Sequence, residues 1–433
     1  MKRYAIKQLL EWKNNPNKKP LIIEGARQVG KTWLMQEFGK SEYRQVAYIN
    51  FENNLQMKMV FDMDLDPKRI IQDIGLNTNL TINPKDTLII FDEIQECPRA
   101  LTSLKYFNET APEYSIIAAG SMLGVTLHKG TSFPVGKVDF MTLYPMSFVE
   151  FLEAIGEERF IPFMEKLDFQ TISVFKDVIV RLLKHYFYIG GMPEAVQDFV
   201  INKDFIRVKD IQNKILKSYE MDFSKHIDSN LVEKIKLLWN SIPAQLSKEN
   251  KKFIYGAIKK GARANDFELA IAWLRDCGLI YQVHRVNKPI DPLKFYEDFS
   301  AFKIFILDIG LFCNLSNVSS SLLIENKKIF EEFNGALTEQ YVLQQLKTKE
   351  KNIFYWSTDT SRSEIDFMIQ SEENVIPIEV KSTINLQAKS LKFFREKFKP
   401  KISVRTSLAD YKKTDDLYDI PLYMIEFIDK IIK

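Results

Sequence analysis

Two kinds of hydrophobic pattern divide the chain at about residue 145. Up to that point, short apolar runs alternate with helical segments. The runs predict strands buried on both faces, as in a parallel sheet. Strands that alternate with helices in this way predict an α/β domain. The five runs are residues 21–23, 45–51, 88–91, 115–119 and 137–141.

Helical periodicity replaces this alternation further along the chain. It extends from Ser147 to Tyr188 and again from Phe205 to Leu246. The segment Gly190–Glu194 reads Gly-Gly-Met-Pro-Glu and interrupts it, because a helix does not continue through Gly-Gly-x-Pro. The pattern therefore predicts a helical region with a break near its centre.

Short helical segments after this region lead into further strand-like runs. Helices followed by a small sheet fit a winged helix-turn-helix, which often places one helix in the DNA major groove. A basic stripe runs along the segment, but Glu249, Asp266 and Glu268 dilute its charge, so DNA contact and a solvated helix face stay equally open. The expected strands are residues 279–283, 293–296 and 304–307, and the stripe consists of Lys248, Lys251, Lys252, Lys259, Lys260 and Arg263.

A hairpin pattern near the C-terminal end carries candidate chemistry. Residues 364–369 and 375–381 predict two strands joined by a polar turn. Side chains alternate along a strand, so Glu379 and Lys381 share one face, and Asp366 can meet them across the hairpin. Carboxylates hold Mg²⁺, and a lysine stabilises the charge on a scissile phosphate. The pattern is therefore compatible with a metal-dependent nuclease.

Some neighbouring residues favour the nuclease interpretation, and others count against it. Glu339 lies on a predicted helix and would point a further carboxylate at the metal. Pro377 counts against the interpretation, because proline suits an edge strand or a bulge. An alternating strand ending in Glu-x-Lys is also common on solvated faces. A basic segment that follows fits a nucleic-acid backbone or a solvated helix face equally well; it contains Lys389, Lys392, Arg395, Lys397, Lys399 and Lys401.

The first apolar run is followed by Gly25–Thr32, which reads Gly-Ala-Arg-Gln-Val-Gly-Lys-Thr. This is the phosphate-binding pattern G-x-x-x-x-G-K-[ST], between a strand and a helix as the pattern requires; the alternative is a glycine turn without a ligand. Lys31 would reach the β- and γ-phosphates of ATP, and the Thr32 hydroxyl would hold Mg²⁺. The residues expected to bind the nucleotide are Gly25, Ala26, Arg27, Gln28, Val29, Gly30, Lys31, Thr32 and Trp33.

Two further strands of the predicted sheet end in polar residues. The run 88–91 leads into Asp92 and Glu93, at the strand end where open α/β sheets bind ligands. Asp92 would hold Mg²⁺ through water, and Glu93 would polarise the water that attacks the γ-phosphate. An acidic helix cap is the alternative. Ser121 follows the run 115–119 and is a candidate contact to the γ-phosphate or this water, or simply the start of a loop.

Composition narrows the class of protein without identifying a partner. The 433 residues carry a net charge of only +3, which argues neither for nor against binding to nucleic acid. Hydrophobic residues make up 45% of the chain, as in globular proteins. No apolar run approaches the roughly 18 residues of a membrane span, and no secretion signal is recognised, so we expect a cytoplasmic protein without a membrane partner. The cysteines and histidines are scattered, which suggests neither disulfides nor a zinc site.

Taken together, these motifs resemble a prokaryotic family of AAA-type P-loop ATPases with a C-terminal domain of unknown function. The resemblance covers nearly the whole chain. It implies ATP and Mg²⁺ as cofactors, ATP hydrolysis, and a restriction-endonuclease-like fold with a PD-(D/E)XK-type motif at the C-terminal end. The residues that carry it are 25–32, 90–93, 120–121, 143–148 with 150–151, 190–194, 252–253 with 255, 308–311, 364–367 and 379–381.

The resemblance also implies a division into domains. These are a P-loop AAA-type domain at 1–145, a helical lid at 146–228, a winged helix-turn-helix at 229–315 and a restriction-endonuclease-like α/β domain at 316–433. It suggests that Pro193 lies near the nucleotide. Many relatives carry arginine where this chain has Lys137, which puts an arginine-finger role there in doubt.

Three functions follow as hypotheses. In the first, ATP hydrolysis drives rearrangement of a nuclease-like C-terminal half that binds DNA. The second adds Mg²⁺-dependent nuclease activity through Glu339, Asp366, Glu379 and Lys381. The third is a nucleotide-gated, non-catalytic adaptor for DNA or protein whose nuclease fold is inactive. The oligomeric state stays open.

Overall fold

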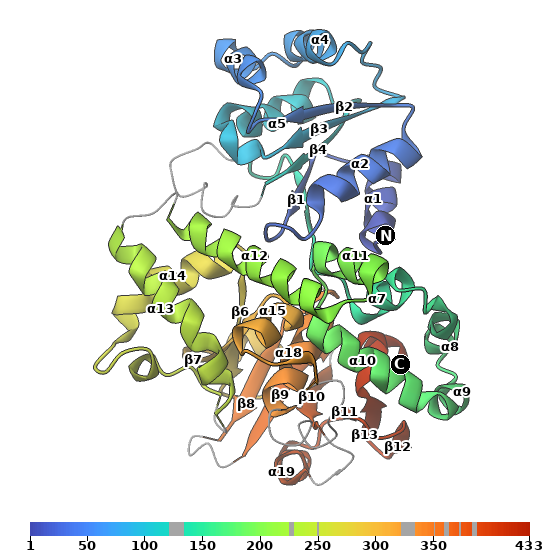
Figure 1. The fold of residues 1–433 in the computed structure, drawn as a ribbon, viewed down its shortest axis with the longest axis vertical. Coiled ribbons are helices and arrows are strands. Elements are labelled where there is room, and N and C mark those ends of the chain that lie inside the picture. The colour runs from blue at the N-terminus through green and yellow to red at the C-terminus, as the bar shows by residue number, and fades with distance from the viewer. Residues whose placement is uncertain are drawn as a thin grey trace. The chain divides into compact units, whose positions relative to one another are not determined.

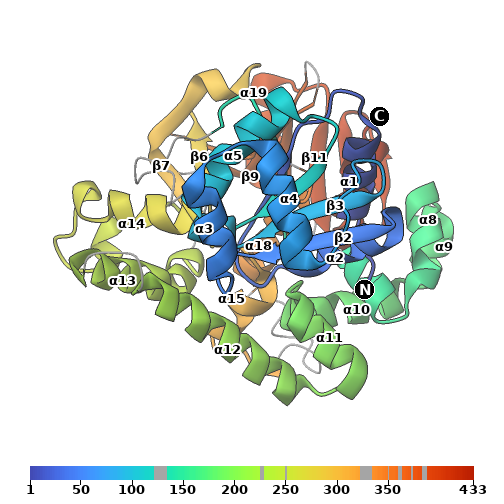
Figure 2. The ribbon, with the colours of Figure 1, turned by 90° about the horizontal axis from the view of Figure 1, so that it is seen from above.

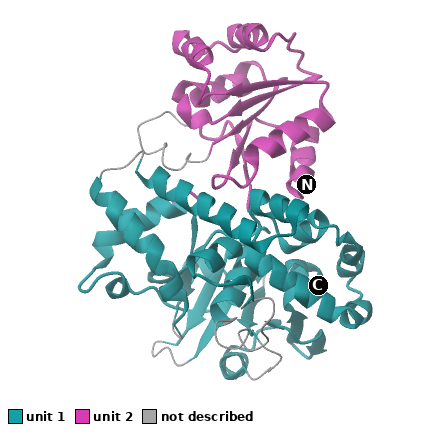
Figure 3. Ribbon diagram, in the orientation of Figure 1, with its two compact units in different colours: residues 1–2, 145–275, 279–433 teal, residues 3–144, 276–278 magenta. Residues whose placement is uncertain are grey.

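The computed structural model describes residues 1–120, 134–224, 229–248, 251–321, 334–349, 351–358, 363–371, 374–382 and 388–433. These residues form two compact units (Figure 3). The N-terminal unit contains residues 3–144 and 276–278, and the C-terminal unit contains residues 1–2, 145–275 and 279–433. No helix in the described part of the chain is long and apolar enough to cross a bilayer.

The N-terminal unit contains a five-stranded sheet in the order β2-β3-β4-β1-β5, with every neighbouring pair parallel (Figure 1). The α/β architecture and all five strands predicted from the sequence are thereby confirmed. The strands are β1 (Leu21–Glu24), β2 (Gln45–Asn50), β3 (Thr87–Asp92), β4 (Ser115–Ala119) and β5 (Asp139–Thr142). The helices are α1 (Ala5–Asn14), α2 (Lys31–Glu42), α3 (Leu55–Met63), α4 (Pro67–Thr78), the 3₁₀ turn η1 (Ile94–Glu96) and α5 (Pro98–Thr110).

Helices cover both faces of this parallel sheet. On one face, α3, α4 and α5 share a core with alternate strand residues, including Ile49, Phe91 and Ile116 (Figures 1 and 2). On the other face, α2 packs so closely that a Cβ on its Gly39 would come within 2.7 Å of Val46. Burial on both faces explains why the strands are continuous apolar runs in the sequence.

The C-terminal unit begins with the predicted helical region. α10 ends at Ile189 and α11 begins at Pro193, so the Gly-Gly-x-Pro break is confirmed. The helices are α7 (Phe148–Ala154), η3 (Glu158–Phe160), α8 (Ile161–Lys166), α9 (Phe169–Val174), α10 (Lys176–Ile189), α11 (Pro193–Asn202), α12 (Phe205–Phe223), α13 (Ser229–Leu246), η4 (Tyr255–Ala257), α14 (Ala264–Asp276), η5 (Leu293–Tyr296), α15 (Ile309–Leu315), α18 (Asn334–Lys347), α19 (Lys389–Phe398), η6 (Leu422–Phe427) and α20 (Ile428–Ile431).

An eight-stranded mixed sheet runs through the rest of the C-terminal unit, in the order β12-β13-β11-β10-β9-β8-β6-β7. The predicted hairpin of residues 364–381 is confirmed as the antiparallel pair β9 and β10. β6 and β7 form an antiparallel hairpin, and β6 connects this hairpin to β8 through a parallel pairing of Arg285 with Tyr355. The strands are β6 (Ile280–Val286), β7 (Glu297–Ile306), β8 (Phe354–Ser357), β9 (Glu364–Ser371), β10 (Asn374–Val380), β11 (Ser403–Ser407), β12 (Lys412–Thr414) and β13 (Leu417–Pro421).

One predicted strand is wrong. Residues Leu293–Tyr296 form the 3₁₀ turn η5 rather than a strand. Phe295 donates its backbone N–H to the Pro292 carbonyl at 3.0 Å, so the backbone closes a local turn instead of a ladder. The apolar residues that suggested a strand are instead split: Leu293 is buried and Phe295 is 84% exposed.

Three of the motifs that carry the family resemblance meet in the C-terminal unit. The fully buried Asp308 carboxylate accepts a hydrogen bond from the Gly191 N–H at 2.6 Å. Met146 in turn donates its backbone N–H to the Gly191 carbonyl at 2.7 Å. A Cβ on Gly190 would lie 2.2 Å from an Asp308 oxygen, so glycine is required where these segments cross.

Candidate functional site

The P-loop between β1 and α2 has the backbone of a phosphate cradle. Gly25, Gln28 and Gly30 have positive φ angles of 141°, 66° and 95°. A Cβ on Gly25 would lie 2.3 Å from the Leu143 carbonyl oxygen, so only glycine fits there. Gly30 caps the N-terminus of α2, where free amides and the helix dipole favour an anion.

Lys31 lies folded against its own loop. Its Nζ donates to the carbonyls of Gly25 and Ala26, both at 2.7 Å, and the residue is 8% exposed. Burial lowers the pKa of Lys31 to about 8, and the carboxylates of Glu93 and Asp92 partly oppose this effect. A buried cation with only carbonyl partners is a strong candidate to pair with phosphate oxygens.

Thr32 and Asp92 meet at the C-terminal ends of the strands. The Thr32 hydroxyl donates to Asp92 Oδ2 at 2.7 Å, although the two residues are far apart in the sequence. Tyr48, at the neighbouring end of β2, donates its hydroxyl to the same Oδ2 at 2.8 Å. Burial and Asp92 together raise the pKa of Tyr48 to about 12, so it stays a donor and orients the carboxylate.

Glu93 is positioned by unusual backbone geometry. Its φ of 50° is left-handed, which is uncommon for a residue other than glycine. The Gln95 side chain donates to Glu93 Oε2 at 2.5 Å. Glu93 lies directly after Asp92, so the two carboxylates leave β3 together at the mouth of the cradle.

These residues fit ATP and Mg²⁺. The glycines give the loop the positive φ angles of a phosphate cradle, and Lys31 and the α2 amides supply positive charge. Mg²⁺ usually keeps several waters and takes one or two carboxylates plus phosphate oxygens, so the Thr32–Asp92 pair is an appropriate donor set. The structure thus brings together four of the predicted site residues, Lys31, Thr32, Asp92 and Glu93.

Other predicted residues stay predictions. Ser121 lies outside the described residues. Trp33 is 41% exposed on α2, and Arg27 is half-buried in the loop. Pro193 belongs to the C-terminal unit, as the first residue of α11. Tyr48 was missed, because a tyrosine within an apolar run predicts only a strand.

The C-terminal carboxylates also come together, in a second cluster. Glu339 of α18 and Glu379 of β10 are buried, and Asp366 of β9 is half-buried. Asp366 accepts the Val380 N–H at 2.8 Å. Burial, Glu339 and Glu379 raise the pKa of Asp366 well above its usual value.

Lysines neutralise this cluster from within. Lys303 of β7 is fully buried, and its Nζ lies 2.5 Å from Glu364 and 3.7 Å from Glu339. Lys251 forms a second ion pair with Glu339, and Lys381 pairs with Glu379 at 2.6 Å. Burial disfavours the charge on Lys303, but Glu364 and Glu339 outweigh burial and raise its pKa. Lys251, counted in a basic surface stripe from the sequence, therefore points into a core.

The second cluster does not fit a divalent metal as the first site does. Among the residues that the structure describes, none donates a hydrogen bond to Glu339 Oε2 or Glu379 Oε2, which leaves acceptor capacity. However, three lysines already balance the carboxylates, and a metal ion would bring two further charges next to them. Within the described ranges, no three carboxylate, histidine or cysteine side chains form a metal-binding group.

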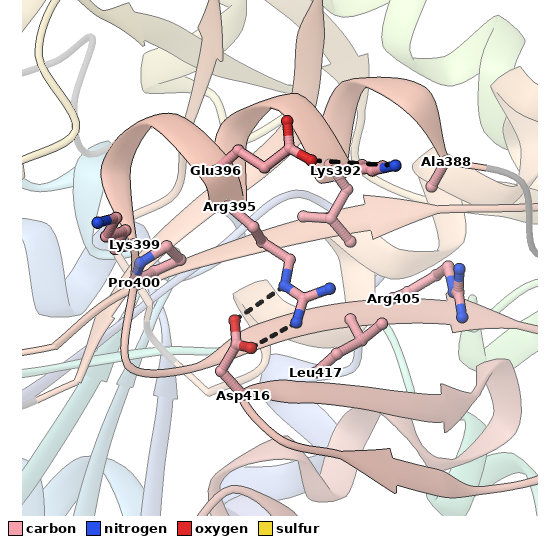
Figure 4. Close-up of a pocket in the computed structure, with 10 residues that line it drawn as sticks. Ala388, Lys392, Arg395, Glu396, Lys399, Pro400, Arg405, Asp416 and Leu417 are labelled. Carbon is pink, nitrogen blue, oxygen red and sulfur yellow. Dashed lines mark hydrogen bonds and ion pairs between the residues drawn. The ribbon is translucent and has the colours of Figure 1, made fainter.

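A basic pocket of about 700 Å³ lies beside α19 (Figure 4). Arg395 extends from the helix to Asp416, with contacts that include Nε to Oδ2 at 2.8 Å. Arg405 of β11 pairs with Asp419 at 2.6 Å. The charged lining is Lys392, Arg395, Glu396, Lys399, Arg405 and Asp416. Cations exceed acids in this lining, although the two arginines are held by carboxylates.

Comparison with solved structures gives only weak similarities. A Walker-type ATPase of Pyrococcus abyssi is 16% identical, with a TM-score of 0.45, over 72% of this chain and 95% of that protein. AMPPCP-bound DnaA from Aquifex aeolicus is 15% identical, with a TM-score of 0.27, over 63% and 85%. The Orc1 protein of Aeropyrum pernix in complex with DNA is 12% identical, with a TM-score of 0.27, over 72% and 91%. TM-scores this low transfer no function.

Comparison with family models is more informative for the N-terminal part. No curated protein sequence matches the chain. Residues 180–322 match a domain of unknown function (DUF8612), and residues 334–425 match another (DUF4143). Residues 17–152 match the AAA domain. With the P-loop geometry described above, this match identifies the N-terminal segment as a P-loop AAA domain.

Proposed function

We propose that the N-terminal unit binds ATP with Mg²⁺ and hydrolyses it. The observation that carries the proposal is the convergence of a phosphate cradle, Lys31 and the Thr32–Asp92 pair at one end of the parallel sheet. Residues from two separate segments, the P-loop and the end of β3, meet there. The AAA-domain match of residues 17–152 supports the same conclusion.

The side chains divide the work of hydrolysis between binding and proton handling. Lys31 exchanges its two carbonyl partners for phosphate oxygens, and the loop amides hold the remaining phosphate charge. Thr32 and Asp92 would hold Mg²⁺, which neutralises charge on the phosphates when bound. Glu93 orients the attacking water and accepts its proton. We further propose that turnover drives a rearrangement of the C-terminal unit.

The test is ATP turnover with Mg²⁺, measured beside nucleotide binding. Lys31→Ala should abolish binding, because the phosphates lose their buried cation. Glu93→Gln should bind ATP but turn it over roughly 100-fold or more slowly, the usual scale for a general base. Lys40→Ala, an exposed lysine at the end of the same helix, should behave as wild type. Normal turnover by Glu93→Gln would remove that residue from its role.

The C-terminal unit supports a second proposal, a docking role without cleavage. The observation that favours it is the lysine-neutralised cluster around Glu339, which does not fit the metal that a nuclease of this kind requires. In this view the nuclease-like part is an inactive fold that binds DNA or protein. A cleavage assay on single- and double-stranded DNA and RNA should find no product. Cleavage that Lys381→Ala eliminates would overturn the docking role.

The basic pocket beside α19 is the proposed DNA contact of this docking role. Its excess of cations suits phosphate oxygens, and such contacts weaken as salt rises. Lys392→Glu with Lys399→Glu should lower affinity for a DNA duplex and flatten the salt dependence of binding. The matched control is Lys214→Glu with Lys217→Glu, which changes the same charge at two exposed lysines of α12 outside the basic segments. Equal loss in both pairs would show only non-specific attraction.

A further inference from the structure

Arg3, just before α1, contacts the P-loop from outside. It is 6% exposed, and its Nη1 donates to the Val29 carbonyl at 2.9 Å. Val29 is the residue before Gly30, the N-cap of α2, so its carbonyl lies before the regular helix ladder, which begins with Leu34 N–H to Gly30 O. Arg3 therefore binds a carbonyl at the point where the loop turns into the helix.

The same guanidinium reaches a second backbone segment. Its Nη2 donates to the Tyr144 carbonyl at 2.6 Å. The preceding residue, Leu143, donates its N–H to the Glu24 carbonyl at 2.8 Å, and its own carbonyl closes on Gly25. The segment 143–144 is thus held to two parts of the P-loop region: directly to Glu24, just before the loop, and through Arg3 to Val29 within it.

The position of this segment in the chain gives the contact its importance. Residue 144 ends the main part of the N-terminal unit, and residue 145 begins the long part of the C-terminal unit. If the P-loop changes conformation and moves Gly25 or Val29, residues 143–144 must move as well. Gly25 lies close against the Leu143 carbonyl, and Val29 is linked to Tyr144 through Arg3. Arginine suits this role, since its planar fork donates to two acceptors in fixed directions.

We propose that Arg3 is a positioning residue that fixes the Val29 carbonyl of the P-loop and links the loop to the connection at 143–144, so that nucleotide binding changes the structure or stability of that connection. A fixed Val29 carbonyl also fixes the peptide plane that presents the Gly30 amide to the phosphate. The inference rests on the proposed ATPase function. It adds a residue that the phosphate-binding motif does not contain.

The first test compares Arg3→Met, Arg3→Lys and Lys2→Met in nucleotide binding and turnover. Arg3→Met should raise the Kd of a fluorescent ADP analogue and the KM for ATP roughly 10- to 100-fold, the effect of losing charged hydrogen bonds at a buried site. The kcat should change much less, because the residue does not touch the reacting atoms. Arg3→Lys keeps the charge and should be intermediate. Lys2→Met, at an exposed neighbouring cation, should match wild type.

The second test is amide hydrogen exchange with and without saturating nucleotide. In wild type, nucleotide should slow exchange at the P-loop and at the Leu143 amide together. In Arg3→Lys and Arg3→Met, saturating nucleotide should still protect the loop, whereas protection of Leu143 should fall. A merely structural role would change exchange at Leu143 equally in both states.

The outcomes separate this inference from the function on which it rests. Wild-type protein that binds no nucleotide would end the proposed function itself. Wild-type Kd and KM in Arg3→Met, or nucleotide protection of Leu143 unchanged in both variants, would overturn the role of Arg3 alone. If Arg3→Met does not fold, Arg3→Lys decides by the same two measurements.

Discussion

The two lysine–carboxylate sites of this chain are built from the same residue types and have opposite characters. In the P-loop site, Lys31 donates hydrogen bonds to two backbone carbonyls, and the carboxylates of Asp92 and Glu93 lie beside the glycine-rich loop. In the cluster around Glu339, three lysines pair with carboxylates directly and complete the charge balance. Lys31 of the first site donates to neutral carbonyls, which phosphate oxygens can replace, whereas the lysines of the second cluster are paired with carboxylates.

This difference shows why residue type is a poor guide to chemistry. A carboxylate can bind a metal when its neighbours leave negative charge unbalanced. The same carboxylate is structural when a lysine from another strand supplies the balancing charge, as Lys303 does for Glu339 and Glu364. Replacing one residue of each site at a time shows whether its partners depend on it.

The largest effect is expected from Lys303→Met. The change leaves Glu364 and Glu339 with less compensation in a buried site, and removing one partner of a buried ion pair costs about 3–5 kcal/mol in the free energy of unfolding. Denaturant unfolding of the full chain measures it. Adding Glu364→Gln should recover part of the loss, and Lys392→Met, at the exposed ion pair with Glu396, should cost under about 1 kcal/mol. Equal losses for Lys303→Met and Lys392→Met would contradict the buried role.

A smaller effect is expected at the P-loop site from Tyr48→Phe. In this variant Asp92 still accepts the hydrogen bond from Thr32 but loses the one from the Tyr48 hydroxyl, which orients its carboxylate. We expect the apparent Mg²⁺ requirement for ATP turnover to rise about tenfold. Tyr106→Phe, on the surface of α5, should leave it unchanged. No change in Tyr48→Phe would mean that Asp92 is oriented without it.

A still smaller effect is expected from Asp366→Asn. Burial and the neighbouring carboxylates raise the pKa of Asp366 and so favour its uncharged form, which an amide should replace at a cost below about 1 kcal/mol. Its raised pKa stabilises the fold below the unfolded value of about 4, and this contribution is lost as pH rises through the folded pKa. Asp366→Asn should therefore flatten the pH dependence of unfolding above pH 4. A loss of several kcal/mol would show that the ionised carboxylate is needed.

The smallest effect, none at all, is expected when divalent ions are removed from the second cluster. EDTA should not shift the unfolding temperature of the nucleotide-free protein, because lysines already supply the charge. Titration with Mn²⁺ followed by calorimetry gives the complementary readout. Binding that Glu379→Gln abolishes would show that the cluster is a metal site after all.

The sequence predicted the N-terminal unit far better than the C-terminal one, for a physical reason. Strands buried on both faces leave an apolar signature, and the phosphate cradle is one contiguous stretch whose glycines are dictated by backbone geometry. Thr32 and Asp92 each lie beside such a signature, so their meeting could be anticipated. The β9–β10 hairpin was predictable because its strands are neighbours in the chain.

What could not be predicted depends on contacts between distant segments. Lys303 and Lys251 resemble ordinary surface lysines in the sequence, and only the meeting of β7, α18 and β9 turns them inward. The role of Arg3 could not be anticipated either, because nothing in the neighbouring sequence indicates that its side chain reaches Val29. Leu293–Tyr296 was mistaken for a strand because an apolar run does not reveal how its amides are satisfied.

The pairing of β6 with β8 has a practical consequence for dissecting this protein. Cutting the chain just before residue 334 would isolate the segment with the DUF4143 match but remove β6 and β7, leaving the flank of β8 with bare amides and carbonyls. Such an open flank invites strands from other molecules, so the excised piece should self-associate. A fragment that starts ahead of β6 keeps this flank covered and retains Lys303.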